Sequence, residues 1–145
     1  MAQKIKSIPL MVQAMQIKNA FPDSHISTEK GHSFVWKHDI SPSPLGDLYS
    51  VKMIYRFGKA PEVYVISPLP LKRPPDANKL EHCYDDEKQM LCLFYPDRSE
   101  WNETMLIATT IIPWIYDWLF HYEIWVGTGE WKGGGVHPGK TNKKQ

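Results

Sequence analysis

Four prolines crowded into one segment impose the strongest constraint on how this chain can fold. They are Pro68, Pro70, Pro74 and Pro75, and all fall within residues 67–80. Proline lacks a backbone N–H and has a fixed φ angle, so it is excluded from helix interiors and from central strands. We therefore expect residues 67–80 to form an extended loop between a strand-rich region and a helical region.

Three strand patterns precede this loop. Residues 32–40, 48–57 and 62–66 are rich in β-branched and aromatic side chains with partial alternation. The segments 41–47 and 58–61 between them contain proline and glycine in turn-forming combinations. Short connections between consecutive strands predict an antiparallel meander.

Two helices are expected on either side of these elements, over residues 8–20 and over about 112–125. Apolar residues recur at spacings of three and four in both segments. Pro113 falls in the first turn of the second helix, where a missing N–H is tolerated. The polar segment 23–31 predicts a loop. The fold class is therefore α+β, with an N-terminal helix, a β-meander, an extended loop and a C-terminal helix.

The length of 145 residues predicts a single domain over 1–145 that can bury a real core. We place that core at about 8–125. The remaining segment, 126–145, is glycine-rich and ends in a lysine-containing basic tail.

Composition excludes several classes of protein. The 17 basic residues nearly balance the 16 acidic ones, so no nucleic-acid-binding surface is indicated. No stretch of 18 apolar residues occurs and no signal peptide begins the chain, which argues against membrane association and secretion. Two cysteines do not make a disulfide framework. A reduced, cytoplasmic protein is expected.

The segment after the proline-rich loop carries the candidate chemistry. His82 lies ten residues before the pair Cys92-Leu93, and Trp101 follows nine residues after Cys92. A nucleophilic thiol needs partial exposure, nearby hydrogen-bond donors and a rigid scaffold. An extended loop that leads into a helix supplies these. The alternative is that Cys92 is a small buried hydrophobic residue between two leucines.

The order of these features resembles that of a ubiquitin-conjugating (UBC) domain over roughly residues 8–125. The stretch from Trp36 to Tyr55, with Ser-Pro-Leu-Gly-Asp-Leu-Tyr at 43–49, is similar to the family's Trp…Ser-Pro-Tyr-Glu-Gly-Gly-hydrophobic run. His82 matches the histidine of the family's His-Pro-Asn motif, and Cys92 falls at the usual distance for the catalytic cysteine. Trp101 matches a tryptophan that precedes the following helix.

The sequence also departs from the common family pattern. Cys83 and Tyr84 replace the proline and asparagine of the motif, and that asparagine is usually credited with stabilising the oxyanion. The run Leu-Cys-Leu-Phe at 91–94, Pro113-Trp114 and the pattern Trp-x-Gly-Gly-Gly-x-His-Pro at 131–138 look more like bacterial members. Those members occur in antiphage operons that encode a cyclic-oligonucleotide synthase (CBASS).

The resemblance implies a function. A bacterial ubiquitin-conjugating-like transferase would carry the C-terminus of a partner protein as a thioester and pass it to an amine. The implied partner is the cyclic-oligonucleotide synthase (CD-NTase), and the acceptor is an unidentified protein or small amine. No cofactor is expected, because the chain has no phosphate-binding glycine loop. The alternative is a non-catalytic binding module of the same fold.

Four residues are candidates for the catalytic site. Cys92 is the expected nucleophile. His82 either orders the loop through backbone contacts or acts as a base. Tyr84 either donates to the oxyanion in place of the asparagine or is an ordinary packed tyrosine. His137, after the triple glycine, either folds back toward Cys92 or lies in a loose tail.

Three further residues are candidates for a loop that guides transfer: Asp97, Glu100 and Trp101. The two carboxylates are placed to position or deprotonate an incoming amine, although solvated loop charges are the common alternative. Cys83 with His82 and Cys92 lacks a second Cys-His pair at ligand spacing. We therefore expect no metal site.

Overall fold

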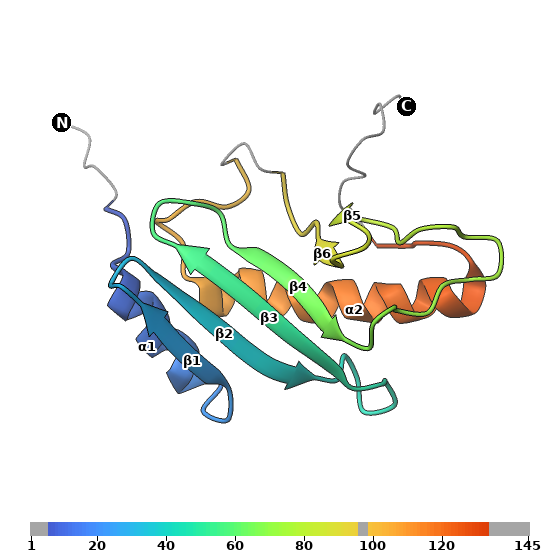
Figure 1. Ribbon diagram of the computed structural model, residues 1–145, viewed down its shortest axis with the longest axis horizontal. Coiled ribbons are helices and arrows are strands. Elements are labelled where there is room, and N and C mark those ends of the chain that lie inside the picture. Colours follow the sequence, from blue (N-terminus) through green and yellow to red (C-terminus); the bar gives the residue numbers. More distant parts are fainter. Residues whose placement is uncertain (1–5, 96–98, 134–145) are drawn as a thin grey trace.

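The computed structural model describes residues 6–95 and 99–133, which form one antiparallel sheet covered by a long helix (Figure 1). The strand order in the sheet is β1-β2-β3-β4-β6-β5, and each pair of neighbours is antiparallel. The strands are β1 (His25–Glu29), β2 (Ser33–Ile40), β3 (Tyr49–Arg56), β4 (Glu62–Ser67), β5 (Cys83–Asp85) and β6 (Met90–Leu91).

The part of the chain that the structure describes also contains two α-helices and one short 3₁₀ helix: α1 (Leu10–Ala20), η1 (Ile107–Thr109) and α2 (Ile111–Thr128). The α2 helix crosses one face of the sheet. The α1 helix lies at the β1 edge of the sheet, where it contacts β1 and η1 (Figure 1). Pro113 lies in the first turn of α2, as predicted, and the helix ends where Gly129 adopts a left-handed φ of 80°. The predicted α+β class is confirmed.

One predicted loop is wrong. Residues 23–31 were expected to be irregular, but His25–Glu29 form β1 and pair with β2 over the register His25↔Lys37 to Glu29↔Ser33. This is an edge strand, and its side chains are exposed apart from the half-buried Ile26. A strand with no buried face shows no apolar alternation, so its sequence looks like that of a loop. The short strands β5 and β6 were not predicted either.

The core lies between the sheet and the inner face of α2. The buried positions of β3 alternate strictly along the strand, which places Val51, Met53 and Tyr55 against the helix side of the sheet. The α2 helix contributes Ile111, Ile115 and Leu119, all fully buried at spacings of four. This packing fixes α2 against the sheet, and α2 in turn forms one wall of the site described below.

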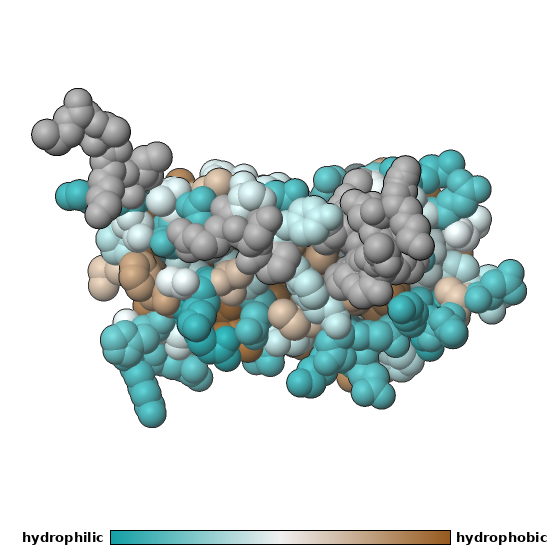
Figure 2. Space-filling model, turned by 90° about the horizontal axis from the view of Figure 1, so that it is seen from above, coloured by the Kyte–Doolittle hydropathy of each residue, from teal (hydrophilic) through white to brown (hydrophobic). Residues whose placement is uncertain are grey.

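The outer surface is mixed in character. In the view from above, hydrophilic residues lie around much of the rim of the molecule, and apolar residues are visible between them (Figure 2). On α1, Met11 and Met15 are exposed. Within residues 6–95 and 99–133, no helix combines the length and the hydropathy that a membrane-crossing segment requires.

A buried glutamine holds the proline-rich loop against the short hairpin β5–β6. Gln89 is 2% exposed, and its side-chain oxygen accepts the Leu71 N–H at 2.7 Å. Its side-chain amide donates to the carbonyl oxygens of Val65 at 2.9 Å and Pro68 at 3.1 Å. Ser67 is the last residue of β4, and residues 68–80 of the predicted loop contain no helix or strand; these bonds give the loop a defined position.

We predict that Gln89→Ala lowers the free energy of unfolding by about 2–4 kcal/mol, because it leaves buried backbone groups of the loop without partners. The matched control is Gln16→Ala on the exposed face of α1, which should change stability by no more than about 0.5 kcal/mol. Urea denaturation of both variants measures the difference. Equal stability of the two variants would contradict this role for Gln89.

Candidate active site

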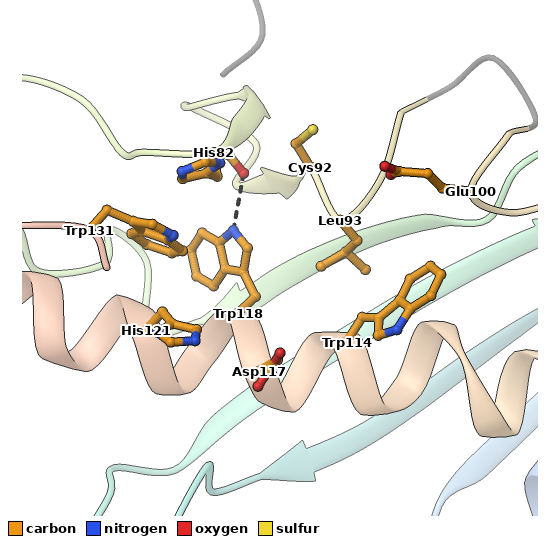
Figure 3. Close-up of a pocket in the computed structure, with 9 residues that line it drawn as sticks. All are labelled: His82, Cys92, Leu93, Glu100, Trp114, Asp117, Trp118, His121 and Trp131. Atoms are coloured by element: carbon orange, nitrogen blue, oxygen red, sulfur yellow. Dashed lines mark hydrogen bonds between the residues drawn. The ribbon is translucent and has the colours of Figure 1, made fainter. Parts of the chain in front are cut away.

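The backbone around Cys92 is anchored by one carbonyl group. Cys92 follows β6 directly, and its N–H donates to the carbonyl oxygen of His82 at 2.8 Å. The same oxygen accepts the indole N–H of Trp118, from α2, at 3.1 Å (Figure 3). His82 itself has a left-handed φ of 50°. The hairpin that carries the candidate nucleophile is therefore fixed to the long helix.

The side chain of His82 is buried and contacts aromatic rings. Its ring centroid lies 4.7 Å from that of Trp131, and Trp131 lies 5.3 Å from Trp118. Trp131 belongs to the segment that leaves α2 and turns back over the helix, so the core extends past its predicted end at residue 125. Of the two roles considered for His82, these contacts fit the ordering of the loop.

Tyr84 places its hydroxyl beside the candidate nucleophile. It lies at the centre of β5, is 41% exposed, and donates to the carbonyl oxygen of Phe94 at 2.9 Å. The Sγ atom of Cys92 lies 3.9 Å from the same oxygen. The pKa of Tyr84 is raised, first by burial and then by its hydrogen bond with Cys92, so the hydroxyl keeps its proton at neutral pH.

The two thiols lie in different electrostatic surroundings. Burial raises the pKa of the Cys92 thiol, whereas hydrogen bonds with the Tyr84 hydroxyl and the Phe94 backbone lower it. Burial also raises the pKa of Cys83, and the neighbouring charges of Asp86, Cys92 and Asp85 raise it further. Cys92 thus has neighbours that stabilise its thiolate, and Cys83 has neighbours that oppose ionisation.

A groove runs between the Cys92 segment and α2. On the loop side it is lined by His82, Cys92, Leu93 and Glu100 (Figure 3). The Glu100 carboxylate accepts the backbone N–H of Tyr95 at 2.8 Å, and its charge also raises the pKa of the Cys92 thiol. The structure therefore brings together Cys92, His82, Tyr84 and Glu100, all four of which the sequence marked as candidates.

The other wall of the groove was not predicted. It is formed by Trp114, Asp117, Trp118 and His121 of α2 and by Trp131 (Figure 3). A Cβ atom at Gly133 would come within 2.6 Å of the His121 ring, so the chain passes directly against this histidine. The α2 residues are spaced at three and four, as on one face of a helix, and that spacing is the signal from which this wall could have been inferred.

One described candidate, Trp101, does not line the groove. Trp101 is a core residue, with its ring 5.9 Å from that of Tyr55 and its indole N–H donating to the Thr110 hydroxyl at 3.0 Å. It anchors the far end of the loop that follows Cys92. Asp97 and His137 lie outside the described residues.

The side chains around Cys92 are of the types that assist reactions of a thiol nucleophile. Within residues 6–95 and 99–133, no cluster of three or more His, Cys, Asp or Glu side chains is arranged to hold a metal ion. What the site offers is the Cys92 thiol, the protonated Tyr84 hydroxyl beside it and the Glu100 carboxylate on the same wall of the groove. These are the groups needed by a nucleophile, an oxyanion donor and a positioned base.

We predict that Tyr84→Phe slows alkylation of Cys92 by iodoacetamide and moves its pH–rate curve to higher pH. The thiolate is the reactive form, and the variant removes a hydrogen bond that lowers the pKa of this thiol. Peptide-resolved mass spectrometry across pH 7–10 measures the rate at each cysteine. The control is Tyr95→Phe, an exposed tyrosine on the same loop, whose curve should match wild type. A Tyr84→Phe curve that coincides with wild type would contradict the contact.

Comparison with known proteins identifies the family. No curated protein matches the chain. Residues 13–138, however, match the family described as Type II CBASS E2 protein. This match extends from α1 through the sheet, the Cys92 segment and α2, and it confirms the resemblance seen in the sequence. The chain belongs to the family of Type II CBASS E2 proteins.

Proposed function

We propose that this protein is a ubiquitin-conjugating-like transferase that carries the C-terminus of a partner protein as a thioester on Cys92. The partner is the cyclic-oligonucleotide synthase (CD-NTase) of the same antiphage system, and the acyl group passes to an amine on an acceptor. The observation that carries the proposal is the position of Cys92, which lines a groove next to a protonated hydroxyl and a carboxylate.

The reaction has two balanced steps. In the first, the Cys92 thiolate attacks the activated C-terminal carboxyl carbon of the partner, a C–S bond forms, and the activating group leaves. In the second, an amine attacks the thioester carbon, a C–N bond forms, and the thiolate leaves as the C–S bond breaks. The amine loses a proton in this step, and activation of the carboxyl is supplied by another protein.

Tyr84 is assigned the oxyanion-donor role of the missing asparagine. A tyrosine hydroxyl carries one proton, which the resting structure directs to the Phe94 carbonyl oxygen at 2.9 Å. The hydroxyl is close enough to Cys92 to shift the pKa of its thiol, so rotation of the O–H turns the proton toward the oxyanion that forms on the acyl oxygen, at the carbon bonded to Sγ. Its raised pKa preserves it as a donor.

Glu100 is assigned to the incoming amine. Its carboxylate lines the groove with Cys92 and acts on the thiol electrostatically. The carboxylate attracts and orients the incoming amine, and it accepts the proton that the amine loses as the C–N bond forms. Its hydrogen bond to the Tyr95 N–H holds the side chain in place.

The direct test is co-expression with the CD-NTase encoded beside it, together with the system's activating protein, followed by non-reducing electrophoresis. Wild type should give a higher-mass band that disappears with a thiol reductant, and Cys92→Ala should lack it. Cys83→Ala is the matched control and should keep the band. A band that is unchanged in Cys92→Ala would overturn the proposed nucleophile.

A second prediction concerns transfer alone. Tyr84→Phe should slow discharge of the preformed thioester to hydroxylamine by on the order of 10²-fold, the typical cost of losing one oxyanion donor. A single-turnover chase measures this rate, with Tyr95→Phe as the control. Discharge at the wild-type rate would show that Tyr84 is not an oxyanion donor and is an ordinary packed tyrosine.

A non-catalytic binding module is the second candidate function. Two observations favour it: Cys92 is only 2% exposed, and the Pro-Asn pair of the usual motif is absent. If wild type and Cys92→Ala both co-purify with the CD-NTase and neither forms a reducible band, the binding module replaces the transferase.

A further inference from the structure

The groove beside Cys92 carries one carboxylate on each wall. Asp117 is exposed on α2 and faces the groove, and Glu100 lies on the opposite wall. No Lys or Arg is among the described residues that line the groove, and Asp117 forms no ion pair within them. A groove of this charge attracts a cation.

The same wall presents aromatic side chains: Trp114 and Trp131 are half-buried, and Trp118 is 5% exposed. Trp114 and Trp118 flank Asp117 on α2, and Trp131 closes the end nearer His121 (Figure 3). The faces of tryptophan rings are the strongest aromatic partners for ammonium and guanidinium groups, and their apolar area accepts the methylene stem of a lysine or arginine. A carboxylate among tryptophans is therefore suited to a cation on an aliphatic stem.

Position decides which substrate carries this cation. In Figure 3, Asp117 lies across the groove from Cys92, with Leu93 and Trp118 between them. The reacting amine must reach the thioester carbon at the sulfur, where Glu100 acts. A cation held at Asp117 is set back from that carbon, so it fits a side chain of the polypeptide already attached to Cys92.

We propose that the α2 side of the groove, formed by Trp114, Asp117, Trp118 and Trp131, binds a lysine or arginine side chain near the C-terminus of the donor protein. This inference rests on the proposed function and names a specificity determinant for its donor. An extended chain advances by about 3.3–3.6 Å per residue. The basic residue is therefore expected within the last few positions before the C-terminal carboxyl.

Binding is tested with synthetic alanine-rich hexapeptides, with a free C-terminal carboxylate, that carry Lys, Gln or Glu at the second, third or fourth position from the C-terminus. Tryptophan fluorescence of the full chain reports binding, because three of its tryptophans line the groove. At one of these positions the Lys peptide should bind about 3- to 30-fold more tightly than the Gln peptide. The Glu peptide should bind most weakly.

Two variants make the test specific. Asp117→Asn should remove most of the preference for Lys, and Asp117→Lys should reverse it in favour of the Glu peptide. The control is Asp23→Asn, an exposed carboxylate in the turn after α1, which should bind like wild type. Equal affinity for all three peptides, no binding of any of them, or a preference that is unchanged in Asp117→Lys would each overturn the proposal.

The source of the cation is tested separately. With the CD-NTase as donor, Asp117→Asn should slow formation of the Cys92 thioester more than it slows discharge of the preformed thioester to free lysine. Slower discharge with normal loading would place the cation on the acceptor and overturn the proposal. Peptide binding requires no reaction, so failure of the transferase function would abolish the thioester but leave the peptide preference in place.

Discussion

The carbonyl oxygen of His82 accepts two hydrogen bonds, from the Cys92 N–H at 2.8 Å and from the Trp118 indole N–H at 3.1 Å. Through this one atom the β5–β6 hairpin, the start of the Cys92 loop and α2 are held together. The left-handed backbone of His82 directs its carbonyl group toward both donors, and the His82 ring packs against Trp131. Because these contacts fix the backbone on both walls, they also define the groove between them.

The chemistry of the site depends on a balance at a buried thiol. Burial alone disfavours the thiolate of Cys92, and Glu100 adds to that effect, whereas the Tyr84 hydroxyl and the Phe94 backbone oppose it. A thiol of this kind is not a strong nucleophile by charge alone. Its effectiveness therefore depends on the orientation of the acyl group and on a hydrogen-bond donor for the oxyanion. In the proposed reaction, Tyr84 is that donor once its O–H turns away from the Phe94 carbonyl oxygen.

Much of the fold could be predicted because it follows from patterns with a direct physical cause. The prolines of 67–80 exclude regular structure, and Pro113 fits a first helical turn. The edge strand β1 was missed because its exposed side chains leave no apolar pattern. At the site, Cys92 and Tyr84 became candidates through the resemblance to the UBC motif, which places the cysteine ten residues after His82 and leaves Tyr84 where the asparagine is expected. Asp117 was not singled out: the spacing along α2 gives the helix face on which it lies, but not that this face docks against a loop distant in sequence.

The central claim is that Cys92 forms a thioester with the C-terminus of its partner. The most direct measurement is mass spectrometry of the protein co-expressed with the CD-NTase and its activating protein, kept at low pH without reductant. The account predicts an intact mass equal to the sum of the two proteins less one water, and a peptide that joins the partner's C-terminal residue to Cys92. A linkage mapped to Cys83 or to a lysine of this chain, with unmodified Cys92, would contradict it.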